Sequence, residues 1–225
     1  MTDYHPGLDG VIATESSISD IDGGKGILSY RGYSIEELAE KSTFEETAYL
    51  LLTGELPSKV ELEGFVKKIN ARIDLPEGLI NLLKTLPKDS NPMDVIQLAV
   101  SSLGTYYPIK FDAEELKANK YTMDYYIAVS AGIIGSIGSI VAAWNRIKNN
   151  KAYIKPDNQL SYAENFMHML DDSIKVTPLI NRIIDATLIL HAEHTINAST
   201  FTAMVTSSTL ASPTQVIASA IGSLS

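Results

Sequence analysis

The stretch IAVSAGIIGSIGSIVAAW, residues 127–144, is eighteen residues long and carries no charge. That length approaches the roughly 20 apolar residues that a membrane-spanning helix needs. Three serines and three glycines interrupt the stretch, however, and nothing else in the chain resembles it. We therefore interpret it as the central part of one long buried helix, expected over Tyr121–Ile147, in a protein that does not enter a membrane.

Small residues recur along this helix at helical spacing, at Ala131, Gly135, Gly138 and Ala142. Residues three and four apart share one helical face, and small side chains there let a second backbone come close. Two interpretations remain open from the sequence. The face packs against another helix of the same chain, or it forms a helix-on-helix interface between two subunits.

Helix-start signals surround this segment on both sides. Ser34 can cap a helix, and Gly54 can end the one that follows it. Three capping boxes occur, each a Ser or Thr followed three residues later by Glu: Thr43 with Glu46, Ser58 with Glu61, and Ser161 with Glu164. Proline at a first helical position marks three more starts: Asn91-Pro92, Thr177-Pro178 and Ser212-Pro213. These signals predict about nine helices joined by short loops.

The first thirty residues differ from the rest of the chain. Val11–Ser19 and Gly26–Tyr30 have the pattern of short strands, and Asp22-Gly23-Gly24 between them is typical of a turn. The sequence therefore predicts a mainly α fold with a small N-terminal β-hairpin. We expect an N-terminal segment over residues 1–33 and a multi-helix domain over residues 34–225.

Composition excludes several classes of function. The 225 residues include 18 Lys and Arg against 27 Asp and Glu, a net charge of −9, which disfavours nucleic-acid binding. Cysteine is absent, so disulfide scaffolds, thiolate zinc sites and cysteine nucleophiles are excluded. The polar N-terminus lacks a signal-peptide pattern, so we expect a cytoplasmic protein.

A histidine pair stands out among the residues that could carry chemistry. His191 and His194 follow an apolar helix expected to run toward Glu193, and a spacing of three places them on one helical face. Two ligands are too few for a metal, and the zincin pattern is not met, so no metal site is predicted. The polar run 195–200 comes next. The cluster either grips a small carboxylate-bearing metabolite or is a satisfied buried polar group, and both interpretations stay open.

Several separated motifs, in this order, resemble the citrate synthase family, especially its bacterial and cyanobacterial members. They are IDGGKGILSYRGY at 21–33, FEETAYLLLTGELP at 44–57, HAEH at 191–194 with NAST at 197–200, and STL at 208–210. The resemblance covers essentially the whole chain. It implies a mostly helical homodimer that condenses oxaloacetate with acetyl-CoA to citrate and CoA, with acetyl-CoA as a substrate and no further cofactor.

The resemblance also implies roles for the histidine segment. The second histidine of the family's His-x-x-His segment hydrogen-bonds oxaloacetate, and this role falls on His194. Asn197 belongs to the same segment and is expected to contribute to the substrate pocket. His191 is expected to be a structural partner.

The helix after residue 210 also fits the family, and the departure comes after that helix. The family continues with a Gly-Pro-x-His-Gly segment whose histidine helps enolise the acetyl group, then a second histidine, a catalytic aspartate and carboxylate-binding arginines. None of these is present before Ser225. We therefore expect the large-domain part of the fold, without the small domain, no catalytic residue within this chain, and no activity from this span alone. The alternatives are a 2-methylcitrate synthase, which uses propionyl-CoA, and a non-catalytic dimeric scaffold.

Overall fold

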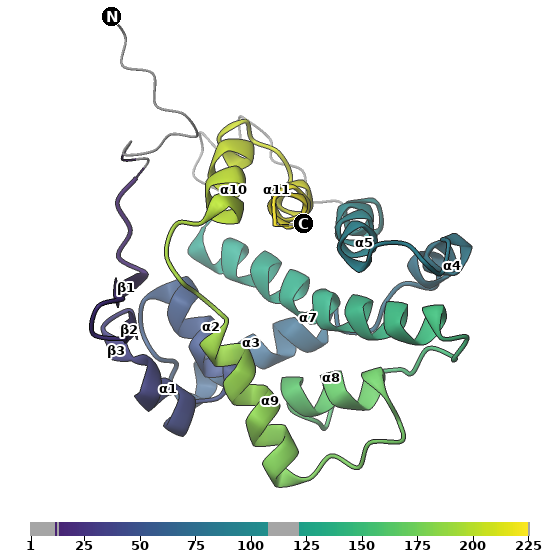
Figure 1. Cartoon of the computed structure of the whole chain (residues 1–225), viewed down its shortest axis with the longest axis horizontal. Helices are drawn as coiled ribbons and strands as arrows, with labels where there is room; N and C mark the ends of the chain where they lie inside the picture. The colour runs from purple at the N-terminus through teal and green to yellow at the C-terminus, as the bar shows by residue number, and fades with distance from the viewer. Residues whose placement is uncertain (1–11, 13, 108–121, 225) are drawn as a thin grey trace, which may run out of the picture.

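The computed structural model describes residue 12, residues 14–107 and residues 122–224. Figure 1 shows a mainly helical protein with a small β-sheet at one end, which confirms the predicted fold class. Within the described residues there are three strands, β1 (Ser19–Asp22), β2 (Ile27–Tyr30) and β3 (Tyr33–Ser34), and ten helices. The helices are α1 (Ile35–Lys41), α2 (Phe44–Thr53), α3 (Lys59–Asn70), α4 (Glu77–Thr85), α5 (Pro92–Tyr106), α7 (Met123–Lys148), α8 (Tyr162–Leu170), α9 (Pro178–Leu190), α10 (Ala198–Ser208) and α11 (Pro213–Gly222).

The predicted hairpin is present, but its first strand lies later in the chain. β1 begins at Ser19, whereas the sequence placed a strand over Val11–Ser19, and Val11 itself lies outside the described residues. Antiparallel pairing explains the shift, because β2 has four residues and pairs with four in β1, from Ser19 opposite Tyr30 to Asp22 opposite Ile27.

A third strand follows that the sequence did not predict. The chain reverses at Arg31 and Gly32, whose φ angles are +51° and +89°. Tyr33–Ser34 then pairs with the end of β2, so the described strands form one antiparallel sheet in the order β1-β2-β3. A two-residue strand is too short to leave a period-two pattern in the sequence.

The predicted helix starts agree with the structure. The three capping boxes are complete, with side-chain and backbone hydrogen bonds in both directions: Thr43 with Glu46, Ser58 with Glu61, and Ser161 with Glu164. Ser34, Asn91 and Thr177 also accept N–H groups of the first turn, whereas Ser212 makes no such bond. Gly54 ends α2 with a φ of +96°, a conformation that glycine adopts easily.

The described residues hold ten helices, where the sequence predicted about nine, and two of the ten had no predicted start. α4 begins after Pro76 without a side-chain cap, so its start carries no local signal. α10 begins inside the run 195–200, which we interpreted only as polar. Its many Ser and Thr residues have modest helix propensity, which hid the helix.

The small-residue face of α7 packs within the chain. A Cβ on Gly135 would overlap the carbonyl oxygen of Ile69 in α3, and one on Gly138 would lie 2.9 Å from Tyr162 Oη in α8. The face is therefore occupied by α3 and α8, and its interpretation as a subunit interface is wrong.

α7 is also the described helix with the length and hydropathy of a membrane span. Over its most apolar window, 61% of the residues are buried inside the protein. Its serines bond to neighbouring backbone, since Ser136 Oγ donates to Arg72 O at 3.0 Å and Ser139 Oγ donates to Ile73 O. These features fit the predicted core helix. It runs from Met123 to Lys148, whereas the sequence placed it over Tyr121–Ile147, and Tyr121 itself lies outside the described residues.

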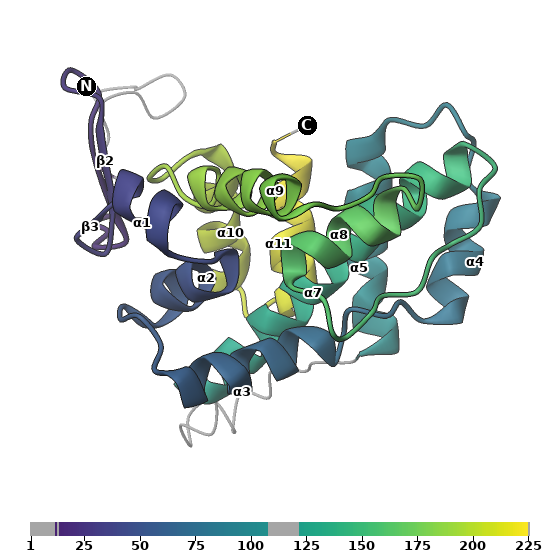
Figure 2. The same cartoon turned by 90° about the horizontal axis from the view of Figure 1, so that it is seen from below.

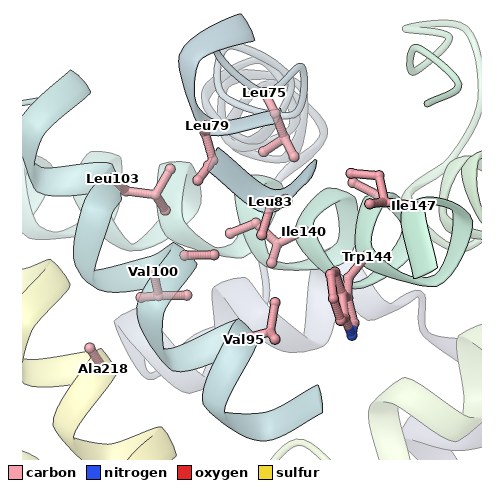
Figure 3. Close-up of a cluster of buried hydrophobic side chains, with 12 residues drawn as sticks. Leu75, Leu79, Leu83, Val95, Val100, Leu103, Ile140, Trp144, Ile147 and Ala218 are labelled. Atoms are coloured by element: carbon pink, nitrogen blue, oxygen red, sulfur yellow. The ribbon is translucent and has the colours of Figure 1, made fainter. Parts of the chain in front are cut away.

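The largest apolar cluster lies at the end of the molecule away from the sheet. Figure 3 shows its side chains converging from α4, α5 and α7, with Ala218 of α11 at the margin. Leu79, Leu83, Val100 and Ile140 have no exposed surface. A second cluster of buried side chains joins β2, α1, α2 and α9 beneath the sheet: Tyr30, Ile35, Leu38, Leu50 and Ile189.

Candidate functional site

The first histidine of the pair ends α9. The helix stops at Leu190, short of the predicted Glu193, and His191 is its C-cap. The His191 ring donates from Nδ1 to Thr187 O at 2.8 Å, which satisfies a carbonyl in the last turn. The backbone leaves the helix at this point, so the expectation that His191 and His194 share a helical face is wrong.

The second histidine is bound to the cap of the next helix. Asn197 is the N-cap of α10, and its Oδ1 accepts the Thr200 N–H at 2.8 Å. Its Nδ2 lies 2.9 Å from His194 Nε2. Because an amide nitrogen only donates, Nε2 must accept, and the neutral ring carries its proton on Nδ1. His194 therefore keeps one N–H to offer to a ligand.

The two predicted site residues are thus brought together, at the start of a helix. The His194 side chain is exposed and Asn197 is partly buried. A helix start concentrates partial positive charge and favours anions. Ser199 Oγ, in the first turn of α10, is buried and has no hydrogen-bond partner among the described residues. Ser199 was quoted only within the NAST motif, and the local signal that was overlooked is Asn197 itself, since Asn is a preferred N-cap residue.

α9, which leads into the histidine segment, is fixed to the end of α1 and the start of α2 by polar contacts. Asp185 Oδ1 accepts the Phe44 N–H at 2.9 Å, and Arg182 donates to Asp185 Oδ2 at 3.1 Å and to Ser42 O at 2.9 Å. Burial raises the pKa of the Asp185 carboxyl, and the Phe44 and Arg182 bonds partly oppose this. These contacts hold α9 in place and therefore set the position of His191 at its end.

A separate apolar cavity lies between α7 and the α10–α11 connection. It has a volume of about 460 Å³ and is lined mainly by aliphatic side chains, including Ile133, Ile137, Leu210 and Val216. Neither His194 nor Asn197 lines it. A site for a small dicarboxylate needs donors and positive charge, so the cavity does not suit this ligand.

Within residues 14–107 and 122–224, no three His, Cys, Asp or Glu side chains gather in a way that could hold a metal ion. The segment between α9 and α10 brings together an imidazole, an amide and the start of a helix.

Comparison with known proteins identifies the family. The family model described as "Citrate synthase, C-terminal domain" matches residues 7–225. The chain is 44% identical over 221 residues to a citrate synthase of Acidithiobacillus ferridurans, covering 98% of this chain and 56% of that protein. It is 40% identical over 227 residues to a citrate synthase of Synechocystis sp., covering 100% and 55% respectively.

Solved structures agree with these matches. The crystal structure of citrate synthase from Pyrobaculum aerophilum superposes with a TM-score of 0.87 at 36% identity, covering 97% of this chain and 54% of that one. The fold and these matches thus define a helical domain of the citrate synthase class. The chain belongs to the citrate synthase family, as its motifs predicted, and it spans about half the length of the curated relatives that it matches.

Proposed function

We propose that residues 191–197 form part of the oxaloacetate site of a citrate synthase, which condenses oxaloacetate with acetyl-CoA to citrate and CoA. The observation that carries this proposal is the pairing of His194 with Asn197 at the start of α10. Family membership supports the reaction, and the matched relatives bear the name citrate synthase.

The chemistry of the segment suits oxaloacetate. Its two carboxylates and keto group all accept hydrogen bonds. The Nδ1–H of neutral His194 is a donor for one of them, and the partial positive charge of the α10 start favours the negative ligand. The recorded hydrogen bonds of His194 and Asn197 involve no Arg or Lys among the described residues. We therefore assign charge neutralisation and proton abstraction to other parts of the complete enzyme.

We also infer that the complete protein is a cytoplasmic homodimer in which further polypeptide covers α9 and α10. Large apolar side chains support such contacts, because Leu179 and Ile183 of α9 and Val205 of α10 are 69%, 53% and 52% exposed. None of the eleven residues of α10 is buried. A separate helix surface of this kind commonly marks an interaction site.

The test is His194→Ala in a protein that spans the full length of the family. Loss of one hydrogen bond to a charged group costs about 1.5–3 kcal/mol, and each 1.4 kcal/mol is a factor of ten. We expect the KM for oxaloacetate to rise at least tenfold and the KM for acetyl-CoA to change much less.

His191→Ala is the matched control. Its ring ends α9, so we expect lower stability with a nearly unchanged KM for oxaloacetate. If the two variants exchange their effects, the assignment within the pair is reversed. If neither alters oxaloacetate use, the site is not an oxaloacetate site, and the non-catalytic scaffold becomes the better interpretation. Measuring both acyl-CoA substrates in the same assay separates acetyl-CoA from propionyl-CoA use.

A further inference from the structure

One cross-strand pair of the N-terminal sheet reaches the histidine segment. Ser19 of β1 and Tyr30 of β2 lie opposite each other in the register. Ser19 Oγ donates to Glu193 Oε1 at 3.0 Å. Tyr30 Oη lies 2.9 Å from Glu193 O and accepts the Glu193 N–H at 3.2 Å. The pair therefore holds both the backbone and the carboxylate of the residue just before His194. Figures 1 and 2 both place the sheet at the end of the molecule where the chain passes from α9 to α10.

The Tyr30 ring is firmly seated. It has no exposed surface and packs in the cluster beneath the sheet with Leu38, Leu50 and Ile189. Its hydroxyl also lies 3.1 Å from Ile189 O, so every recorded partner of Oη lies between residues 189 and 193. A phenylalanine ring at position 30 would fill the same apolar site, so packing does not require the hydroxyl. The hydroxyl instead forms hydrogen bonds with the end of α9 and with the turn that follows it.

Glu193 in turn shapes the backbone on the far side of His194. Its Oε1 accepts the Thr195 N–H at 2.5 Å. Thr195 has a φ of +78°, in the left-handed region that β-branched residues rarely adopt. Such a conformation persists where the surroundings over-determine it. His194 is therefore held between a residue fixed by the sheet and a residue whose unusual backbone is fixed by that same carboxylate.

We propose that Tyr30, with Ser19, is a positioning residue for the substrate histidine, and that it acts through Glu193. The sheet and the histidine segment are more than 150 residues apart in sequence, and the hydroxyl of Tyr30 joins them. This inference rests on the proposed function for the role of His194 in binding oxaloacetate. The hydrogen bonds that orient His194 stand independently of it.

The first test uses Tyr30→Phe in the 225-residue chain, with the imidazole ¹H–¹⁵N signals as the readout. The His194 signals are assigned by their loss in His194→Ala. We expect Tyr30→Phe to shift or broaden them. Tyr162→Phe is the matched control, because Tyr162 Oη also donates to a backbone oxygen, Ile134 O at 2.8 Å, but in the contact between α7 and α8. It should leave the His194 signals unchanged. Unchanged signals in Tyr30→Phe would overturn the proposal.

The second test measures kinetics in a protein that spans the full length of the family. Tyr30→Phe should raise the KM for oxaloacetate about three- to tenfold, the range expected for one neutral hydrogen bond, with little change for acetyl-CoA. Tyr162→Phe should change neither constant. Ser19→Ala removes the carboxylate contact without altering the core, so it tests the same effect even where Tyr30→Phe does not fold.

The outcomes separate the two ideas. If His194→Ala leaves the oxaloacetate KM unchanged, the proposed function fails. If His194→Ala raises it and both Tyr30→Phe and Ser19→Ala behave like the Tyr162→Phe control, the positioning role fails while the proposed function stands.

Discussion

Two regions of the molecule differ in how far their large apolar side chains are buried. Where α4, α5 and α7 meet, Leu79 and Leu83 are completely buried. On α9 and α10, the helices on either side of the histidine segment, Leu179 is 69% exposed and Val205 is 52% exposed. The first region holds the protein together by burial. The second region presents polar groups on helices that the described chain covers incompletely, so the two regions should respond to substitution in different ways.

The sharpest test of this difference is a matched pair of leucine truncations. Leu83→Ala removes a fully buried side chain and leaves a cavity, so we expect it to lower the free energy of unfolding by about 2–5 kcal/mol. Leu179→Ala makes the same chemical change at an exposed site, where surface substitutions usually cost less than about 0.5 kcal/mol. Urea unfolding of the 225-residue chain measures both.

Equal losses from the two truncations would break the comparison. They would mean that the α9 surface is already covered, for instance by self-association of the chain. Repeating the unfolding over a tenfold range of protein concentration distinguishes this case, because association makes apparent stability depend on concentration.

A buried carboxyl between the two regions gives a smaller, pH-dependent effect. Glu45 of α2 accepts the Tyr162 N–H at 2.8 Å, and burial raises its pKa above the ordinary value of 4.5. The folded protein therefore keeps this proton to higher pH than the unfolded chain does. The stability that the protonated group contributes is full below pH 4.5 and is lost as the pH rises through the raised pKa.

Glu45→Gln should remove this dependence while keeping an oxygen that accepts the Tyr162 N–H. As the pH rises above 4.5, the free energy of unfolding of Glu45→Gln should therefore increase relative to that of the unsubstituted chain. For one proton the gain is at most about 1.4 kcal/mol per pH unit. Urea unfolding between pH 4.5 and 7 measures it. Parallel stability curves would show that the Glu45 proton is not linked to folding.

Local signals explain what the sequence could predict. The caps at Thr43, Ser58 and Ser161 involve residues three apart, so the pattern and the hydrogen bonds coincide. α4 was missed because Pro76 offers no side-chain acceptor, and β1 was misplaced because its extent depends on the length of β2. The sequence around α4 holds no capping pattern, and the sequence around β1 does not show which residues of β2 it pairs with.

The same limit applies to longer-range features. The small-residue face of α7 was correctly seen as a close-contact face, but its occupants, α3 and α8, come from elsewhere in the chain. In the site, motif resemblance selected His194 and Asn197, and the structure adds the 2.9 Å contact between them. Tyr30 was named only as the end of a predicted strand and as part of a motif. Its contact with Glu193 crosses 163 residues, and no local pattern encodes it.

The smallest expected effect on stability, and the most specific effect on the site, comes from Asn197→Asp. Aspartate caps a helix as well as asparagine does, so its oxygen can still accept the Thr200 N–H, and we expect the free energy of unfolding to change by less than about 0.5 kcal/mol. The second carboxylate oxygen replaces the Nδ2 donor beside His194 Nε2. That nitrogen must then present a proton, which removes the preference for the Nδ1–H tautomer.

The ¹⁵N shifts of the two His194 ring nitrogens report the change directly, because protonated and unprotonated nitrogens resonate far apart. Asn197→Ala is the control, since it loses the cap and should cost about 0.5–2 kcal/mol. If Asn197→Asp leaves both nitrogen shifts as they were, Asn197 does not set the tautomer. If Asn197→Asp moves the two nitrogen shifts while the free energy of unfolding stays unchanged, the site can be altered without a loss of overall stability. The two leucine truncations test the same separation, because they compare the stability cost of a core residue with that of a residue on α9.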